Sequence, residues 1–441
     1  MFRVILAFLL AGSLSCRADA AFWSVELAYD GGSGAGDCSL ALDHQGVPHI
    51  TYTADGVLYH AVRTLTGWTA EPIQTVGYWG GLSSIAFDTA NRPCAAFVDS
   101  TDSVTNYLCF ARKGAAWSTE RVADIGWWAD HVSLAVSPTS QPCIAFCRTV
   151  GADVFVSLAR RLGADQWSIE NIAVVGSVTG PSVAFTDSGT AYVAFVDSDS
   201  GLLKIARNDG YGWTIVAVDG GSGQFAVSYP SLGISPSGNP VVAYFLSSES
   251  GSVLKLAVYT GSSWEKQTIA QFTVPVYFAH CAALVTPSGL PLVVYQDPSS
   301  SCLKAAWKIG PIWATEEIDS APMSGGRPCI RYGGTDLYLC YFDGLEFNVK
   351  LARASVPLTV QQAKSFADGS PVEISWLVAS AGSQDFANAV YVQSVDRTGG
   401  LKLRFTSAQP AVSRGDMLDV KGVITTIDGE RTIVDPVVRV Y

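Results

Sequence analysis

The sequence predicts an all-β protein in which a seven-bladed β-propeller is followed by a small five-stranded barrel. Three observations lead to this fold class. A Trp-led pattern of four short strands recurs along most of the chain, Gly, Pro, Asn, Asp and Ser separate the strands, and near residue 354 the pattern gives way to different strand-like runs. A fixed period of roughly 20 to 50 residues marks a repeat architecture. With 48% hydrophobic and only 15% charged residues, the chain can also bury a large core.

Each copy of the repeat has the pattern of one propeller blade. A Trp strand, often with Glu three residues later, is followed by a loop and by runs such as "SLALDHQG", "PHITY" and "LYHAVR". Because a four-stranded sheet with two apolar faces must pack against neighbours on both sides, seven copies predict seven blades in a ring. Recurrence of the Trp in every copy favours packing between blades over ligand binding. At spacings of 45 to 51 residues, these are Trp23, Trp68, Trp117, Trp167, Trp213, Trp264 and Trp313.

The repeat is out of phase with the chain. It begins on a Trp strand, and its seventh copy stops after "VKLARA", one strand short. We expect "FWSVELA" to supply the missing outer strand of the blade built from residues 329–353, which leaves no open sheet edge. Residues 21–356 then form the propeller. Residues 357–441 form a second unit, whose five strand-like runs predict the small barrel.

Residues 1–20 have the pattern of a secretory signal peptide. An Arg precedes an apolar run, and Ala18-Asp19-Ala20 provides a small-residue cleavage motif. We therefore expect a secreted monomer, extracellular or periplasmic; a lipoprotein anchor at Cys16 is disfavoured because the residues before it match that motif poorly. No later stretch holds 18 consecutive apolar residues, so no membrane span is predicted.

The charge of the chain argues against nucleic acid as a partner. The formal net charge is −11, and cleavage after residue 20 would remove two Arg and one Asp and leave −12. Such a protein repels phosphate backbones, and no dense Lys/Arg patch reverses this locally.

Nine of the ten cysteines remain after that cleavage. Cys94 and Cys109 flank a predicted hairpin at positions that could face each other, so a disulfide there is one interpretation. The other is that the cysteines serve as small buried hydrophobic residues within strands.

The stretch "SLALDHQGVPHITY" raises the question of a metal or acid–base site, because it holds Asp43, His44 and His49 within seven positions. Copies two to six place Asp, Ser, Thr or Pro at the first two of these positions, and Cys, Tyr, Val or Leu at the third. Asp43 and His44 are therefore expected to form a turn, and His49 to begin a strand.

Function should lie where the copies differ, on the face where loops gather over the central channel. The residue just before each inner strand should lie at the channel mouth, and these residues are Asp37, Leu82, His131, Gly180, Tyr229, His280 and Arg327. The adjoining loops "GYWGG", "GWWADH" and "VYFAH" add aromatic faces, which suit an amphipathic ligand such as a sugar. The alternatives are an ordinary wet rim and aromatic residues that fill space between blades. Our candidate ligand-binding residues are Asp37, His131, Tyr229, His280, Arg327, Trp79, Trp128 and Phe278.

The second strands of four blades end in Asp on the same face, at Asp99, Asp197, Asp297 and Asp343. Asp before a Ser- or Gly-rich loop usually caps a turn. We predict no cofactor; Ca²⁺ is the one metal left open, although no run resembles a dedicated calcium loop.

Two parts of the chain resemble known protein families. Trp-x-x-Glu-x-Ile, Ser-Leu-Ala-x-Asp-x-x-Gly-x-Pro and Leu-x-x-Ala-Arg, over residues 22–354, resemble propeller repeats of secreted bacterial and archaeal surface proteins. In the C-terminal unit, "VQSVD", a Gly-Leu strand and "GDMLDVKG" resemble a bacterial secreted OB-fold domain. An OB-fold implies binding of an oligonucleotide or oligosaccharide. Only Tyr391 and Phe405 are obvious aromatics there, which argues against nucleic acid.

Two functions stay open. The first is a non-catalytic binding protein for an extracellular glycan or protein. The second is a glycan-cleaving enzyme, a glycoside hydrolase or lyase of sialidase-like propeller type, that would use Asp37 with His131, Tyr229 or His280 as acid and base. The turns lack the Trp of a sialidase Asp-box, and only Arg148 and Arg327 lie on the predicted ligand face. Binding is therefore favoured, and no catalytic residue is assigned.

Overall fold

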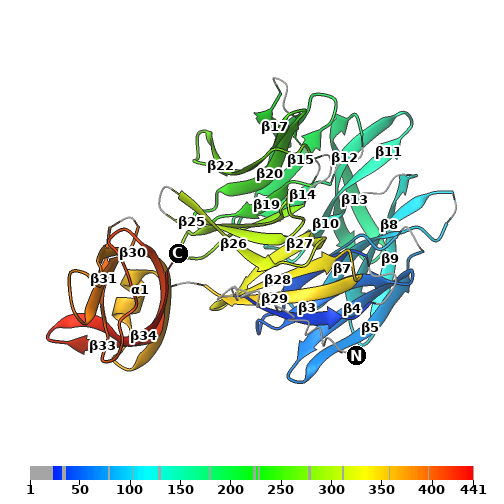
Figure 1. The fold of residues 1–441 in the computed structure, drawn as a ribbon. Helices are drawn as coiled ribbons and strands as arrows, with labels where there is room; N and C mark the ends of the chain where they lie inside the picture. Colours follow the sequence, from blue (N-terminus) through cyan, green and yellow to red (C-terminus); the bar gives the residue numbers. More distant parts are fainter. Residues whose placement is uncertain are drawn as a thin grey trace, which may run out of the picture.

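The computed structural model shows seven β-sheets arranged around an axis and a closed barrel beside them (Figure 1). This confirms the predicted fold class. The residues that the structure describes are 23–31, 36–77, 80–102, 104–127, 131–177, 180–221, 225–226, 229–276, 280–309, 312–356, 358–395 and 397–440.

Each sheet is one blade, in which the strands run from the channel to the rim. The first three blades are β2(Cys38–Leu42), β3(Pro48–Ala54), β4(Val57–Thr64), β5(Gly67–Thr75); β6(Ser83–Phe87), β7(Pro93–Asp99), β8(Asn106–Lys113), β9(Trp117–Gly126); and β10(Ser133–Val136), β11(Pro142–Val150), β12(Asp153–Gly163), β13(Gln166–Val175). The next three are β14(Ser182–Phe185), β15(Ala191–Asp197), β16(Leu202–Asn208), β17(Trp213–Gly220); β19(Ser231–Ile234), β20(Pro240–Ser248), β21(Gly251–Tyr259), β22(Trp264–Phe272), with β18(Phe225–Ala226) also paired to β20; and β23(Cys281–Val285), β24(Pro291–Gln296), β25(Leu303–Ile309), β26(Ile312–Asp319).

The seventh blade joins the two ends of the propeller. It consists of β27(Ser324–Gly333), β28(Asp336–Asp343), β29(Asn348–Ser355) and β1(Ser24–Tyr29). Strand β1 runs antiparallel to β29, with Ser24 opposite Arg353 and Glu26 opposite Leu351. The predicted closure of the ring by the first strand is therefore confirmed.

The recurring Trp joins neighbouring blades through a polar link. Its indole Nε1 donates to the Glu on the outer strand of the preceding blade, as in Trp167 to Glu120 at 3.0 Å. Arg161 pairs with the same carboxylate at 2.5 Å, and both charged side chains are about nine-tenths buried. The Glu that follows five of these Trp residues by three positions is thus explained as the acceptor for the next blade. The same indole-to-carboxylate bond occurs in Trp23–Glu316, Trp68–Glu26, Trp117–Glu71 and Trp213–Glu170.

A second link couples the inner strands around the channel. A Ser on each of five inner strands accepts a hydrogen bond from a main-chain N–H of the next blade, as in Ser84 from Leu134 at 3.0 Å. We call this the serine bracket. Its members are Ser39, Ser84, Ser133, Ser182 and Ser231. The corresponding positions of the sixth and seventh blades hold Ala282 and Cys329.

All nine described cysteines are free, so the disulfide interpretation of Cys94 and Cys109 is wrong. In the hairpin register Cys94 lies opposite Arg112, and Cys109 lies opposite Phe97. Residues 94 and 97 are an odd number of positions apart, so their side chains leave opposite faces of the strand. The two cysteines accordingly pack in different hydrophobic clusters.

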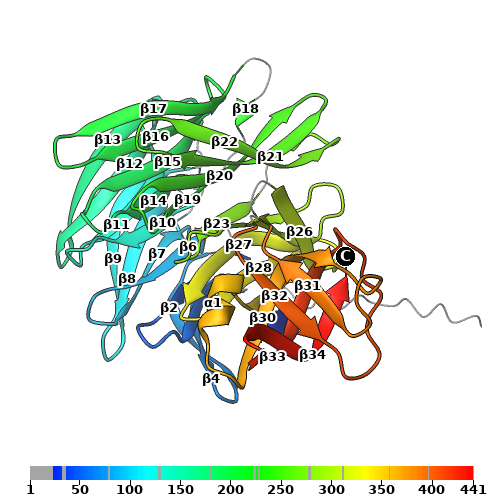
Figure 2. The same ribbon diagram turned by 90° about the vertical axis from the view of Figure 1, so that its left-hand side faces the viewer.

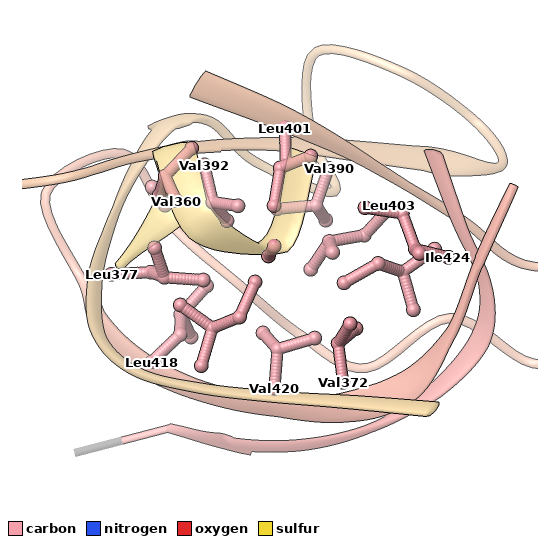
Figure 3. Packing of buried hydrophobic residues seen from close by; sticks show 14 of the residues in the cluster. Val360, Val372, Leu377, Val390, Val392, Leu401, Leu403, Leu418, Val420 and Ile424 are labelled. Carbon is pink, nitrogen blue, oxygen red and sulfur yellow. The ribbon is translucent and has the colours of Figure 1, made fainter. Parts of the chain in front are cut away.

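The C-terminal unit is a closed barrel with the strand order β30–β31–β32–β34–β33, in which β32 and β34 are parallel. Its core is aliphatic apart from Phe405, and α1 covers one end, with Val360 pointing inward (Figure 3). The sequence did not predict this helix, which begins with a capping box between Thr359 and Gln362. The elements are α1(Val360–Ser365), β30(Ser370–Ala381), β31(Ala389–Gln393), β32(Gly400–Arg404), β33(Met417–Ile427) and β34(Glu430–Val440).

The barrel lies beside the sixth and seventh blades (Figures 1 and 2). Trp376 of the barrel packs in a hydrophobic cluster with residues of these two blades. Side chains of β30 alternate, so Ile374 points into the barrel and Trp376 would be expected to follow it. The register shifts between Ile374 and Leu377, and Trp376 adopts a positive φ of 61°. The indole therefore packs in the propeller cluster, only 7% exposed, while Leu377 takes the place in the barrel core.

Among the described residues, no helix has the length and apolar character needed to cross a membrane.

Candidate functional site

The predicted mouth residues lie together at one end of the central channel. Asp37, His131, Tyr229 and His280 lie within two residues of the start of an inner strand, and Arg327 lies in the irregular first part of β27. His131, Tyr229, His280 and Arg327 line a cavity of about 160 Å³. Asp37 contacts Arg327 but is not part of the cavity wall.

A cluster of three rings forms one side of the mouth. The ring of Tyr229 lies 4.6 Å from that of His280 and 6.3 Å from that of His131, measured between centroids. A Cβ at Gly180 would come within 2.4 Å of the Tyr229 ring and within 3.0 Å of the His131 Cβ. The glycine at this mouth position therefore provides the space in which the three rings meet.

The electrostatics of this cluster keep His280 neutral. Burial is the largest cause, and together with the charges of Arg327 and His131 it lowers the pKa of His280 to about 3. Tyr229 has a positive φ of 72°, and a left-handed backbone is uncommon for a residue other than glycine. The phenol is thus held between two imidazoles by a strained main chain.

An ion pair between Asp37 and Arg327 spans the junction of the first and seventh blades. Nη1 of Arg327 lies 3.3 Å from Oδ1 of Asp37. The other oxygen, Oδ2, accepts a hydrogen bond from the main-chain N–H of Ser83 at 2.7 Å. Oδ2 of this buried Asp is therefore hydrogen-bonded within the protein, and Oδ1 lies in ion-pair contact with Arg327.

The cavity wall is cationic, in contrast to the chain as a whole. Arg331 lies on the wall together with Arg327, and no Asp or Glu is among the described residues that line it. Sequence reasoning missed Arg331. The signal was present, because six other copies hold Ala, Gly or Leu at this position of the inner strand.

The aromatic candidates Trp79, Trp128 and Phe278 lie outside the described residues. Trp127, next to Trp128, is 74% exposed, and Phe225 in β18, on the connection between the fourth and fifth blades, is 36% exposed. An exposed Trp beside β9 offers a flat apolar face on the side of the propeller where the mouth lies.

The four Asp residues that end second strands form turns, as predicted. Each accepts a hydrogen bond from the main-chain N–H two residues later, for example Thr101 to Asp99 at 2.9 Å. In three blades a Lys seven residues later also contacts the carboxylate at 2.6 Å, in the pairs Lys204–Asp197, Lys304–Asp297 and Lys350–Asp343. These contacts satisfy the four carboxylates within the protein, so nothing about them indicates a Ca²⁺ site.

In the "LDHQGVPH" stretch, Asp43 forms a turn, and His49 belongs to a row of polar side chains that contact one another. Oδ1 of Asp43 accepts from the main-chain N–H groups of Gln45 and Val47, which is a turn contact. Nδ1 of His49 lies 2.9 Å from Nε2 of His60, whose Nδ1 lies 3.0 Å from Oε1 of Glu71. Among the described residues, no group of His, Cys, Asp and Glu is arranged to hold a metal ion.

Comparisons with known proteins leave the reaction open. No protein-family model and no curated sequence matches this chain. Among solved structures it is similar to a catalytically inactive virginiamycin B lyase from Staphylococcus aureus, at 11% identity and a TM-score of 0.49, over 76% of this chain and 99% of that one. It is also similar to a fungal alcohol oxidase in complex with copper, at 10% identity and a TM-score of 0.49, over 95% of this chain and 98% of that one. A Hadza microbial sialidase gives 13% identity and a TM-score of 0.41, over 70% and 76%.

Such likenesses concern the propeller fold alone. By its fold and its site, the protein is a seven-bladed β-propeller whose channel mouth is cationic and lined by imidazoles.

Proposed function

We propose that this protein is a secreted, non-catalytic binding protein that takes an acidic group of an extracellular glycan at the channel mouth. The observation that carries the proposal is the composition of the cavity wall. Arg327 and Arg331 line it, no carboxylate is among its described residues, and the chain around it has a net charge of −11. A positive wall in an acidic protein favours anions at this one place.

The size of the cavity limits how a glycan would bind. Sites for drug-sized ligands usually enclose roughly 300 to 1,000 Å³, whereas this cavity measures about 160 Å³. A single carboxylate or sulfate substituent would enter, and the sugar chain would lie across the mouth. The exposed Trp127 supplies an apolar face of the kind on which sugar rings stack.

Three features favour binding over hydrolysis. Glycoside hydrolysis generally needs two carboxyl groups at the scissile bond, and none is present on the described wall. Asp37, the nearest candidate, is held by Arg327 and the Ser83 N–H. A histidine with a pKa near 3 is also a weak general base at neutral pH.

A lyase is the second candidate, because Tyr229 lies between His131 and His280 with a strained backbone. In a β-elimination, Arg327 would neutralise the uronate carboxylate, and Tyr229 would take the C5 proton and protonate the departing glycosidic oxygen as the C4–O bond breaks. Strained residues cluster at active sites, which is the specific support for this alternative.

The proposal also includes export of the protein and an OB-type fold for the C-terminal barrel. The composition of residues 1–20 supports export. The parallel pairing of β32 with β34 in a five-stranded barrel supports an OB-type fold for residues 357–441, and with it a second place for an oligosaccharide.

The test is calorimetric titration with an oligogalacturonate and with its neutral methyl ester. We expect the acid to bind and the ester to bind at least tenfold more weakly, with the difference shrinking at high salt. Arg331→Met leaves the Asp37–Arg327 pair intact and should weaken binding of the acid by about tenfold or more, since a charged hydrogen bond contributes roughly 1.5 to 3 kcal/mol. Arg353→Met, on the outer part of the seventh blade, is the matched control.

Equal binding of acid and ester, or an unchanged affinity in Arg331→Met, would refute the proposal. Appearance of ultraviolet-absorbing unsaturated sugar ends during incubation would identify the lyase, and its dependence on Tyr229 is checked with Tyr229→Phe.

A further inference from the structure

Three thiols meet where the seventh blade packs against the first. Cys329 on β27 lies directly opposite Cys340 on β28. Cys38, on the inner strand of the first blade, directs its Sγ toward the carbonyl oxygen of Arg327 at 3.9 Å. Sγ of Cys329 in turn lies 3.5 Å from the carbonyl oxygen of Leu40. We call this group the thiol cluster.

The three thiols affect one another's ionisation. The neighbouring Cys340 thiol lowers the pKa of Cys329 below its ordinary value, and the nearby charge of Arg331 acts in the same direction. Burial and the neighbouring thiols of Cys329 and Cys38 raise the pKa of Cys340. Cys329 is therefore the thiol that forms a thiolate first.

Access to the cluster is one-sided. Cys329 is partly exposed, whereas the other eight described cysteines are buried. Cys38 and Cys329 both line the cavity at the channel mouth, and Cys340 is not on that wall. A reagent that enters the cavity thus meets Cys329 with Cys340 behind it.

The repeat shows that Cys329 replaces a structural residue. In five other blades this position is the Ser of the bracket, which accepts a main-chain N–H from the next blade. At Cys329 the sulfur approaches a carbonyl oxygen instead. The seventh blade therefore lacks the Ser-to-amide hydrogen bond and has in its place a nucleophilic sulfur atom on the cavity wall.

We propose that the thiol cluster is a thiol–disulfide exchange site for small organic disulfides that enter through the channel mouth. The Cys329 thiolate attacks one sulfur of the ligand, its S–S bond breaks, and the first thiolate leaves and takes a proton from water. Cys340 then gives up its proton and attacks the Cys329 sulfur, releasing the second thiolate, which is protonated in turn. The ligand is reduced by two electrons to two thiols, and the protein gains one Cys329–Cys340 disulfide.

This inference does not rest on glycan binding: both use the same cavity, but the exchange is read out as a covalent change at Cys329 and Cys340, which glycan binding does not require. The experiment treats the full chain with hydroxyethyl disulfide and follows intact mass and disulfide-linked peptides. The wild-type protein should lose two hydrogen atoms and yield a Cys329–Cys340 peptide pair. Cys340→Ser should stop at the mixed disulfide on Cys329, and Cys329→Ser should stay unreacted over the same time.

Cys329→Ser is expected to fold, because Ser occupies this position in five blades. Cys94→Ser, at a buried thiol of the second blade, is the matched control and should react as the wild type does. Modification of Cys329→Ser at the wild-type rate, a Cys38–Cys329 bridge, or a mixed disulfide that persists in the wild type would overturn the assignment of the two roles.

Discussion

At the scale of single residues, the buried histidines of the first blade determine how the protein responds to acid. His49 is 9% exposed and His60 is 1% exposed, and they are hydrogen-bonded to each other. Burial is the largest cause, and together with the neighbouring His60 it lowers the pKa of His49 to about 4. In the unfolded chain a His titrates near 6.5. Protonation therefore favours the unfolded state at pH values below about 6.5.

We predict that His49→Gln makes stability less sensitive to acid. Because the folded pKa is depressed, the contribution of His49 is fully present above about pH 6.5 and is lost as pH falls toward 4. This loss amounts to at most about 3 kcal/mol. The free energy of unfolding, measured in urea between pH 7 and pH 4, should fall by that much less in the variant. The exposed His44→Gln is the control, and equal slopes for His49→Gln and the wild type would contradict the prediction.

The sequence could show that His49 begins a strand but not what it contacts. Its partner His60 lies on the next strand, and Glu71 on the one after, so the chain of contacts depends on the register of two hairpins. Register by itself is weakly encoded in short apolar strands. The error at Cys94 and Cys109 has the same origin, because one wrong step in register moves a side chain to the other face.

At the scale of elements, β1 is the strand that closes the ring. Besides its pairing with β29, it carries Glu26, which accepts from Trp68 at 3.1 Å and pairs with Arg63 at 2.6 Å. Trp23 just before it donates to Glu316 of the sixth blade. This strand therefore contributes to both interfaces of the seventh blade. The periodicity of the sequence was sufficient to predict its place, because a repeat that stops one strand short must be completed from elsewhere.

We predict that deletion of residues 23–29 opens the seventh blade without unfolding the first six. Main-chain amides of β29 should lose hydrogen-exchange protection, because their partner strand is gone. A synthetic peptide of the deleted sequence should restore protection at one molecule per chain, and a scrambled peptide should not. Unchanged exchange in β29 after the deletion would mean that β1 is dispensable for closure.

At the scale of the whole molecule, Trp376 fastens the barrel to the propeller. Its main-chain N–H donates to Oδ1 of Asp419 at 3.0 Å, which holds the strained backbone that turns the indole outward. The strand-like runs of residues 357–441 predicted the barrel, but the alternation of β30 would have placed Trp376 inside it. The register shift between Ile374 and Leu377 determines whether the Trp376 side chain lies in the barrel core or at the interface. A periodic sequence pattern does not predict such a shift.

We predict that Trp376→Ala uncouples the two units. Truncation of a buried Trp typically costs about 3 to 5 kcal/mol. Here much of the lost packing lies at the interface between the two units. Calorimetry should therefore show separate melting of barrel and propeller in the variant, and a single transition in the wild type. Phe386→Ala, at a half-exposed aromatic of the same barrel, should keep one transition. A single transition in Trp376→Ala would show that the indole does not couple them.

The serine bracket has a consequence for how such a protein changes over generations. Each link joins a Ser hydroxyl to a main-chain N–H of the next blade. It therefore does not depend on which side chain the donor residue carries. A unit copied or lost from the middle of the array would meet its new neighbours with the same attachment. At the boundary between the last unit and the first, the two ends of the ring are instead joined by unlike residues. New side chains can therefore be substituted at that boundary while the blades in the middle of the array keep the same attachment.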